Sequence, residues 1–418
     1  MHVPPILAAL RKHKSGVVLI SLQIALTLAI VCNAIFIIAN RIERVSRPTG
    51  IVENNLVLAT QQWADAPTGS DQASIDKNAS LRQRDLAVLR GLPGVASAAA
   101  VSTVPLGGNG WNGAVSRKPH ISIADRSSYQ MVGFYFMGPP GVSTLGVKLI
   151  AGRNFKPDEV TRLTQGRPAA SPVIIISRHL AHRLFPHGHA LGQTVYLNGK
   201  PKPITIIGVV ERLQTMNVGF SNNFAFDSVI VPQITGIGYS VYAIRAKPGR
   251  MAAVMHEIRP ALYKADPMRV MDDDSVQSFA QIRHDAYEGD IGMAILMGVI
   301  CLILIAITAA GIVGLTSFWV GQRRKQIGIR RAIGATRGDI LRHFQTENFL
   351  IVGAGIVLGL LLAFALNILL MRHYELPRLP LSYLPIGALA LWVLGQAAVL
   401  GPALRAAAVP PVVATRSV

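Results

Sequence analysis

Long apolar runs without a charged residue alternate with polar segments along this chain. Four such runs have 23 to 30 residues each: Val17–Ala39, Ile291–Val320, Phe349–Met371 and Leu379–Leu404. A helix needs about 20 apolar residues to cross the hydrocarbon core of a bilayer. The pattern therefore predicts four transmembrane helices. Most of the chain stays outside the membrane, chiefly as one large domain at 40–290.

Two strand–helix–strand units are predicted within 40–290, one near each end. Alternating apolar residues indicate the strands, and apolar residues three or four apart indicate the helices. The predicted elements, in chain order, are a strand at Asn55–Thr60, a helix around Ser80–Leu92, a strand at Val95–Val104, a strand at Ser240–Ala246, a helix at Met251–Ala265 and a strand at Met268–Met271. Two such units indicate a split βαβ core.

The segment between these units, about 106–238, is rich in Gly and Pro and contains the β-branched runs Val173–Ile176 and Ile204–Val210. It is predicted to be an inserted, mostly β subdomain. The polar stretch Asp65–Ser80 is expected to be a mobile loop, because it is rich in residues typical of loops.

A helical stalk is expected where the large domain meets the membrane. Ile42 and Val45 follow the first apolar run, and Val276, Phe279 and Ile282 precede the second, all at helical spacing. Two transmembrane helices are therefore predicted to continue outward. The second apolar run alone, at 1.5 Å per residue, is about 45 Å long, which exceeds the roughly 30 Å hydrocarbon core.

Basic residues beside the spans predict the orientation, because short loops rich in Lys and Arg stay in the cytoplasm. The loop at 321–348 contains seven of them, whereas the loop at 372–378 has only Arg372 and Arg378. Both termini and 321–348 are therefore expected in the cytoplasm. The first run is longer than the apolar region of a signal peptide, so an uncleaved anchor is expected.

The predicted layout has eight parts with this orientation. They are a cytoplasmic N-terminus at 1–16, a span at 17–39, the outer domain with its stalk at 40–290, a span at 291–320, a cytoplasmic elbow at 321–348, spans at 349–371 and 379–404, and a cytoplasmic tail at 405–418. The formal net charge of +19 follows largely from the loops beside the spans. Nucleic-acid binding is not expected, since no dense basic stripe with interleaved aromatic residues occurs.

The sequence lacks the motifs of several common catalytic and binding sites. The sequence has no phosphate-binding GxxxxGK[ST] loop, no HExxH and no GxSxG. Cys32 and Cys301 both lie in apolar runs, so neither belongs to a disulfide framework of the outer domain. No Asp, Glu, Lys, Arg or His lies within an apolar run, although ion pumps and proton-coupled carriers usually need such a residue. The chain is therefore not expected to be an enzyme by itself, and its energy would come from elsewhere.

Three further features have a functional and a structural interpretation. His179, His182, His187 and His189 could form a metal site, but a His-rich loop after a short helix is the preferred interpretation. Asp272–Asp274 lack the alternating spacing of a calcium loop, so a solvated turn is expected. Gly355 and Gly359 form a GxxxG pattern that suits close helix packing but is only a weak indication of a dimer.

The loop between the second and third spans has the most specific pattern. A short helix is predicted to end near Gly334, because glycine suits the position after a helix. Thr336 is predicted to cap a second helix, with Asp339 three residues later as the partner in a capping box. The result would be a rigid, basic elbow that projects from the membrane and suits docking. The alternative is a loop whose basic residues only set the topology.

The residues of this elbow resemble a family signature. The sequence IGIRRAIGATRGDI at 327–340, followed by FQTENFLI at 344–351, resembles the MacB/FtsX family of ABC-transporter permeases. Segments at 134–155 and 184–210 are similar to the outer domain of that family. The chain departs from the family pattern in two places. Gln326 stands where Glu is common, which puts one contact to the ATPase in doubt, and His187–His189 replaces a usually acidic stretch.

The resemblance implies a membrane α-helical fold of four spans, with an α+β extracytoplasmic domain on a helical stalk. It implies a permease that pairs with a second, identical or different permease in the bacterial inner membrane, with the large domain in the periplasm. A cytoplasmic ABC ATPase subunit would bind ATP and Mg²⁺, and no cofactor is expected in this chain. The residues expected to couple the permease to that ATPase are Ile327, Gly328, Ile329, Arg330, Arg331, Ala332, Gly334, Ala335, Thr336, Asp339 and Glu347.

The expected activity is efflux of a drug, peptide or other small molecule by a MacB-type mechanism, in which motion is transmitted to the outer domain. A periplasmic adaptor and an outer-membrane channel could assist. The alternative is a permease that releases lipoproteins or regulates a cell-wall hydrolase.

Overall fold

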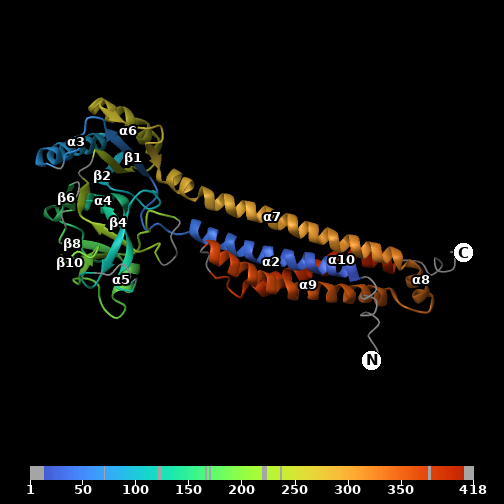
Figure 1. The fold of residues 1–418 in the computed structure, drawn as a ribbon. Coiled ribbons are helices and arrows are strands. Elements are labelled where there is room, and N and C mark those ends of the chain that lie inside the picture. The colour runs from blue at the N-terminus through green and yellow to red at the C-terminus, as the bar shows by residue number, and fades with distance from the viewer. Residues whose placement is uncertain are drawn as a thin grey trace. The chain divides into compact units, whose positions relative to one another are not determined.

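The computed structural model describes residues 14–69, 71–120, 125, 127–164, 167–168, 171–218, 224–235, 238–374 and 378–408. Two compact units form from the chain (Figure 1). One unit, called the helical unit, comprises Met1–Val45 and Gly289–Val418. The other, called the outer unit, comprises Ser46–Glu288.

Four long helices are apolar and long enough to cross a membrane, which confirms the prediction of four spans. They are α2 (Lys14–Val45), α7 (Phe279–Gln322), α9 (Arg337–Tyr374) and α10 (Tyr383–Ala407). A short helix, α8 (Arg324–Ala332), lies between α7 and α9 in sequence. Helix α2 includes Ile42 and Val45, and α7 includes Phe279 and Ile282, so both helices extend beyond their apolar runs as predicted.

Val276 is not part of this helical extension, contrary to the prediction. It lies in the strand β15 (Val276–Ser278), which pairs antiparallel with residues 57–59. The helical spacing of Val276, Phe279 and Ile282 misled the prediction, because pairing with a strand more than 200 residues earlier is invisible in a local pattern.

Small residues allow α2 and α9 to pack closely within the helical unit. A Cβ atom on Gly355 would lie 2.8 Å from Cβ of Ile24, and one on Gly359 would lie 2.9 Å from Cβ of Leu28. The GxxxG pattern of α9 is thus occupied by α2 of the same chain. The amide of Asn33 on α2 also donates to the carbonyl oxygen of Ala363 on α9, at 3.1 Å.

The outer unit contains a five-stranded sheet in the order β14-β1-β13-β2, with β15 also paired to β1. Its remaining strands are β1 (Leu56–Trp63), β2 (Val95–Val101), β13 (Tyr239–Ala246) and β14 (Arg269–Val270). Strand β13 pairs antiparallel with both β1 and β2, so the two predicted strand–helix–strand units interlock. Helices α3 (Gln72–Gly91) and α6 (Met251–Ala265) contribute to one hydrophobic core with this sheet.

The expectation of a mobile loop over all of Asp65–Ser80 is wrong, because α3 begins at Gln72. The carboxylate of Asp71 caps the helix by accepting a hydrogen bond from the backbone N–H of Ser74, at 3.0 Å. Several residues that α3 buries are polar, among them Asn78, Arg82 and Asp85. A helix with so polar a buried face resembles a loop in a hydropathy pattern.

The inserted segment forms a second sheet, as predicted for a mostly β subdomain. Its order is β5-β10-β8-β11-β4-β3-β9, and a further pairing of β9 with β10 closes six of these strands into a ring. The strands are β3 (Trp111–Ser116), β4 (Gln130–Phe136), β5 (Leu149–Gly152), β8 (Val173–Ser177), β9 (Thr194–Leu197), β10 (Ile204–Val210) and β11 (Ser228–Val231). Apolar side chains from β3, β4, β8, β9, β10 and β11 fill the core of the ring.

Short elements surround this ring. Helix α4 (Pro139–Leu145) follows β4, and α5 (Arg178–Leu184) follows β8. A small third sheet contains β12 (Gln233–Thr235), β6 (Thr161–Thr164) and β7 (Arg167–Pro168), and a 3₁₀ turn, η1, covers Pro157–Glu159.

Candidate coupling site

One side of helix α8 packs against the other helices of the helical unit. Ile327 is 5% exposed and belongs to a core cluster that includes Val320, Ile340 and Phe344. A guanidinium N–H of Arg331 donates to the carbonyl oxygen of Ala407, at the end of α10, over 3.1 Å. The helix is therefore fixed by both apolar packing and a hydrogen bond.

The turn after α8 is a Schellman motif. Gly334 has a φ of +107°, a conformation that favours glycine, and its N–H donates to the carbonyl of Arg331 at 3.2 Å. The N–H of Ala335 donates to the carbonyl of Arg330 at 3.0 Å. These two bonds satisfy carbonyl groups that the end of a helix leaves free. The prediction that the short helix ends at Gly334 is confirmed.

A capping box begins α9, as the spacing of Thr336 and Asp339 predicts. The N–H of Thr336 donates to Oδ2 of Asp339 at 2.9 Å, and the N–H of Asp339 donates to Oγ1 of Thr336 at 3.2 Å. The Thr336 hydroxyl also donates to the same carboxylate, at 2.6 Å. Two helix ends are thus locked within a few residues, which makes the elbow rigid.

Replacing Thr336 by valine is expected to loosen the start of α9. The substitution keeps the side-chain volume but removes the hydroxyl that accepts from Asp339, so amides of residues 335–341 should exchange about fivefold faster. Hydrogen exchange with mass spectrometry measures this change in the full chain. Thr346→Val is the matched control, because its hydroxyl donates to the carbonyl of Arg342 within α9 and takes no part in the cap. Equal exchange in both variants would contradict the role of the cap.

Glu347 supports the elbow from inside the helical unit. It is 2% exposed, and its two carboxylate oxygens lie 2.9 and 3.2 Å from Nη1 of Arg323. The Arg323 guanidinium also lies 5.9 Å from the ring centre of Trp319. This ion pair joins the residue between α7 and α8 to α9. Because it is buried, the Glu347 side chain is not accessible at the surface of the helical unit.

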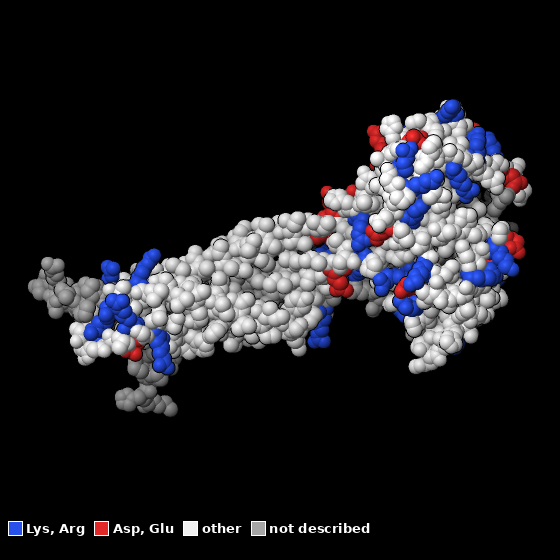
Figure 2. Space-filling model, turned by 180° about the vertical axis from the view of Figure 1, so that it is seen from behind, with Lys and Arg blue, Asp and Glu red and all other residues white. Residues whose placement is uncertain are grey.

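The predicted site residues fall into three groups by exposure. Ile327, Gly328 and Glu347 are buried, and Arg331 and Ala335 are half-buried. The exposed residues are Ile329, Arg330, Ala332, Gly334, Thr336 and Asp339. Figure 2 shows Lys and Arg side chains gathered at the end of the helical unit that carries α8, beside a long surface almost without charge.

Ile333 is also exposed on the elbow, although it was not among the predicted site residues. Its side chain is 81% exposed, and that of Ile329 is 45% exposed. Two residues four apart lie on one face of a helix, so the sequence did contain this signal. We call Ile329, Arg330 and Ile333 the elbow surface. It combines exposed apolar groups with a basic group, as protein-binding surfaces often do.

In the histidine-rich segment at 179–189, one histidine contacts a carboxylate and the other three are exposed. Nδ1 of His179 lies 2.7 Å from Oδ1 of Asp227, a carboxylate that also pairs with Arg183. His182, His187 and His189 are exposed. The part of the chain that the structure describes contains no group of three or more His, Cys, Asp or Glu residues that could hold a metal ion.

The aspartates at 272–274 form the solvated turn that was predicted. The N–H of Ser275 donates to the carbonyl of Asp272 at 3.0 Å, and the Asp273 side chain is fully exposed.

Comparison with known proteins identifies this combination of a four-helix membrane unit and an α/β domain between its first two spans. A family model described as the MacB-like periplasmic core domain matches residues 23–261, and one described as the FtsX-like permease C-terminal matches residues 298–411. The first match covers more than half of the chain. The chain is a membrane transporter component, and it belongs to the MacB/FtsX family of ABC-transporter permeases.

Several curated proteins are similar to this chain. The macrolide export ATP-binding/permease protein MacB of Neisseria gonorrhoeae is 26% identical over 263 residues, which are 60% of this chain and 38% of that protein. MacB 1/2 of Paracoccus denitrificans is 27% identical over 324 residues, 72% of this chain and 46% of that protein. The uncharacterized ABC transporter permease YvrN of Bacillus subtilis is 26% identical over 277 residues, 61% of this chain and 66% of that protein. The chain thus spans less than half the length of these MacB relatives.

Two solved structures are also similar. The periplasmic region of MacB from Actinobacillus actinomycetemcomitans has a TM-score of 0.31 and 14% identity, covering 58% of this chain and 97% of that one. The extracellular domain of the transporter YknZ from Gram-positive bacteria has a TM-score of 0.32 and 14% identity, covering 53% of this chain and 98% of that one.

Proposed function

We propose that this permease takes its driving force from an ABC ATPase that docks on the elbow surface. The single observation that supports this proposal most is the exposed apolar group of Ile333, 81% exposed and beside basic residues on a rigid elbow. A rigid elbow transmits force, because its Schellman turn, capping box and Glu347–Arg323 ion pair leave little freedom for bending. ATP and Mg²⁺ would be bound by the ATPase.

The remaining parts of the proposal follow from the family. The chain would lie in the bacterial inner membrane with both termini in the cytoplasm and the outer unit in the periplasm. It would pair with a second permease, identical or different, and could use a periplasmic adaptor and an outer-membrane channel. The four apolar runs contain no Asp, Glu, Lys, Arg or His, which supports a mechanism that moves the outer unit instead of an ion path through the spans.

Docking is tested by substitutions that replace the apolar and basic groups of the elbow surface with acidic ones. Ile333→Asp and Arg330→Glu are each expected to lower permease-stimulated ATP hydrolysis at least about tenfold, because exposed apolar and Arg anchors often dominate an interface. Gly334→Pro is expected to do the same by breaking the turn, whose φ of +107° proline cannot adopt. The measurement is ATPase activity of the reconstituted complex in lipid nanodiscs.

Lys325→Glu is the matched control for Arg330→Glu. Both residues are exposed on α8, but a separation of five residues places them on different faces of the helix. The control variant should keep its stimulation, and all variants should insert in the membrane. Normal stimulation in both Ile333→Asp and Arg330→Glu would refute docking at this surface.

The transported molecule is proposed to be a drug, peptide or other small molecule that leaves the cell. The names of the MacB relatives, which refer to macrolide export, support this choice. A pull-down of the full chain in mild detergent, followed by mass spectrometry, tests it together with macrolide tolerance after deletion. An ATPase with an adaptor and lost tolerance would support efflux. Co-purified lipoproteins or a cell-wall hydrolase, with unchanged tolerance, would instead indicate lipoprotein release or hydrolase regulation.

A further inference from the structure

Beside α8, the surface of the helical unit that is almost without charge ends and basic side chains begin (Figure 2). On α10, Leu400 is 40% exposed and Leu404 is 56% exposed, and the next residue, Arg405, is exposed as well. Leu404 is the last residue of the fourth apolar run. Arg405 therefore lies at the level where the hydrocarbon core of a bilayer meets the lipid headgroups.

Helix α8 brings two further arginines to this level. The guanidinium of the half-buried Arg331 donates to the carbonyl of Ala407 at 3.1 Å, so α8 lies against the end of α10. Arg324 is exposed and precedes Arg331 by seven residues, close to two turns, so both are on one face of α8. It follows Val320, the end of the second apolar run, by four residues, about 6 Å along a helix and within one headgroup layer. We call Arg324, Arg331 and Arg405 the basic margin.

The acids at this end of the helical unit bind residues outside the basic margin. In the described segments 299–374 and 378–408, the acids are Asp339 and Glu347. Asp339 accepts from Thr336 in the cap of α9, and the buried Glu347 pairs with Arg323. Guanidinium groups bind phosphates through charge-assisted hydrogen bonds. A lipid phosphate therefore complements the charge of the basic margin.

We propose that the basic margin binds the phosphate of an anionic phospholipid, whose acyl chains lie along Leu400 and Leu404. Two leucines four residues apart share one face of α10, and they lead directly to Arg405. One molecule with an anionic head and apolar chains thus fits both features. The exposed Arg324 and Arg405 provide the contacts, whereas Arg331 is already bonded to Ala407 and adds only its charge.

A lipid is favoured over a docked protein as the occupant. Arg405 adjoins leucines that face the lipid, and the face of α8 with Arg324 and Arg331 differs from the face with Ile329 and Ile333. Basic residues next to a membrane span are attracted to anionic lipids. The inference does not rest on docking of an ATPase, because lipid binding is measured on the permease alone.

The test is native mass spectrometry of the full chain in neutral detergent, titrated with dioleoyl phosphatidylglycerol or dioleoyl phosphatidylcholine. The fraction of the chain that retains a lipid gives an apparent dissociation constant. The two probes have the same acyl chains, and the anionic one should bind at least about fivefold more tightly, which is the effect of about one basic residue. Glycerol phosphate has the phosphate but no acyl chains, so it should not displace phosphatidylglycerol at the same concentration.

Substitutions at the end of the helical unit locate the site. Arg324→Gln and Arg405→Gln should each weaken binding of phosphatidylglycerol about fivefold and leave binding of phosphatidylcholine unchanged. Arg337→Gln is the matched control, because it removes one exposed charge at the same end of the unit. Arg337 precedes the third apolar run by twelve residues, about 18 Å along α9, so it lies beyond the headgroup layer and its loss should have no effect.

Equal affinity for the two lipids would overturn the proposal, and displacement by glycerol phosphate would show that the basic margin binds a free phosphate compound instead. Equal effects of Arg405→Gln, Arg324→Gln and Arg337→Gln would overturn the location. Unchanged lipid binding in Arg324→Gln and Arg405→Gln, with lowered permease-stimulated ATP hydrolysis, would assign the basic margin to ATPase docking and refute lipid binding. A melting temperature shows that each variant is folded, and if one is not, the other decides the outcome.

Discussion

The double variant Gly355→Leu/Gly359→Leu is expected to leave most of the helical unit unfolded. A Cβ on Gly355 would lie 2.9 Å from the backbone oxygen of Ser21, and one on Gly359 would lie 3.0 Å from Cα of Ala25. Because backbone atoms cannot rotate away, α9 would have to move off α2. Overpacking usually costs about 1–3 kcal/mol per site, and backbone contacts place these two near the upper end.

The measurement is thermal unfolding of the full chain in nanodiscs, together with the yield of monodisperse protein. Gly353→Leu is the matched control on the same helix, because nothing lies within 4 Å of its added Cβ. That variant should melt close to the wild type. Equal melting temperatures for Gly353→Leu and the double variant would show that α2 does not occupy the GxxxG groove.

Replacing Asp85 by alanine is expected to have the largest effect on the outer unit. Asp85 and Arg269 are both fully buried and form two bonds, of 2.9 and 3.1 Å. The carboxylate also accepts from the hydroxyl of Tyr242 at 2.9 Å and from the amide of Gln61 at 3.2 Å. Its removal leaves an uncompensated buried guanidinium, which costs about 3–5 kcal/mol.

Urea titration followed by hydrogen exchange of β1 and β13 measures this loss. Asp273→Ala is the control, since its side chain is fully exposed, and it should change stability by no more than about 0.5 kcal/mol. Asp85→Leu/Arg269→Met should recover much of the stability, because it removes both charges. If the double variant is no more stable than Asp85→Ala, the cost comes from packing and not from the unpaired charge.

Local patterns in the sequence predicted the parts of this protein that depend on neighbouring residues. The four apolar runs predicted the four spans, because a membrane requires a minimum length whatever the tertiary contacts. The Schellman turn at Gly334 and the capping box of Thr336 and Asp339 were predicted for the same reason. Each of their hydrogen bonds joins residues at most five positions apart.

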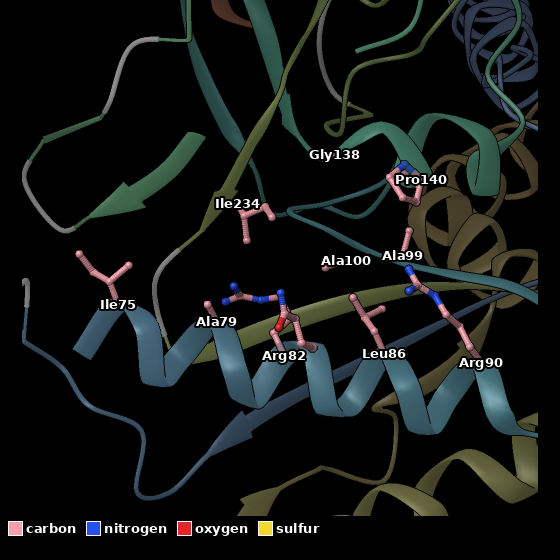
Figure 3. A pocket seen from close by; sticks show the side chains of 12 residues that line it. Ile75, Ala79, Arg82, Leu86, Arg90, Ala99, Ala100, Gly138, Pro140 and Ile234 are labelled. Atoms are coloured by element: carbon pink, nitrogen blue, oxygen red, sulfur yellow. The ribbon is translucent and has the colours of Figure 1, made fainter. Parts of the chain in front are cut away.

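The incorrect predictions have a common cause in contacts between distant segments. The first turns of α3 looked like a loop, because the residues that they bury are only Ile75 and the polar Asn78, and Ile75 lines the same hollow of the outer unit as Ile234, 159 residues later (Figure 3). Val276 looked helical but pairs with β1. No local pattern contains such partners.

The sequence alone thus determined the number of spans, the two strand–helix–strand units of the outer unit and the turn and cap of the elbow, since spacing along the chain specifies them. Only the tertiary structure decided which helix fills the groove of Gly355 and Gly359, and which elbow residues face outward. It also brought Arg82 and Arg90 of α3 together with Pro140 and Ile234 around one hollow. These features depend on packing between segments that lie far apart in the chain.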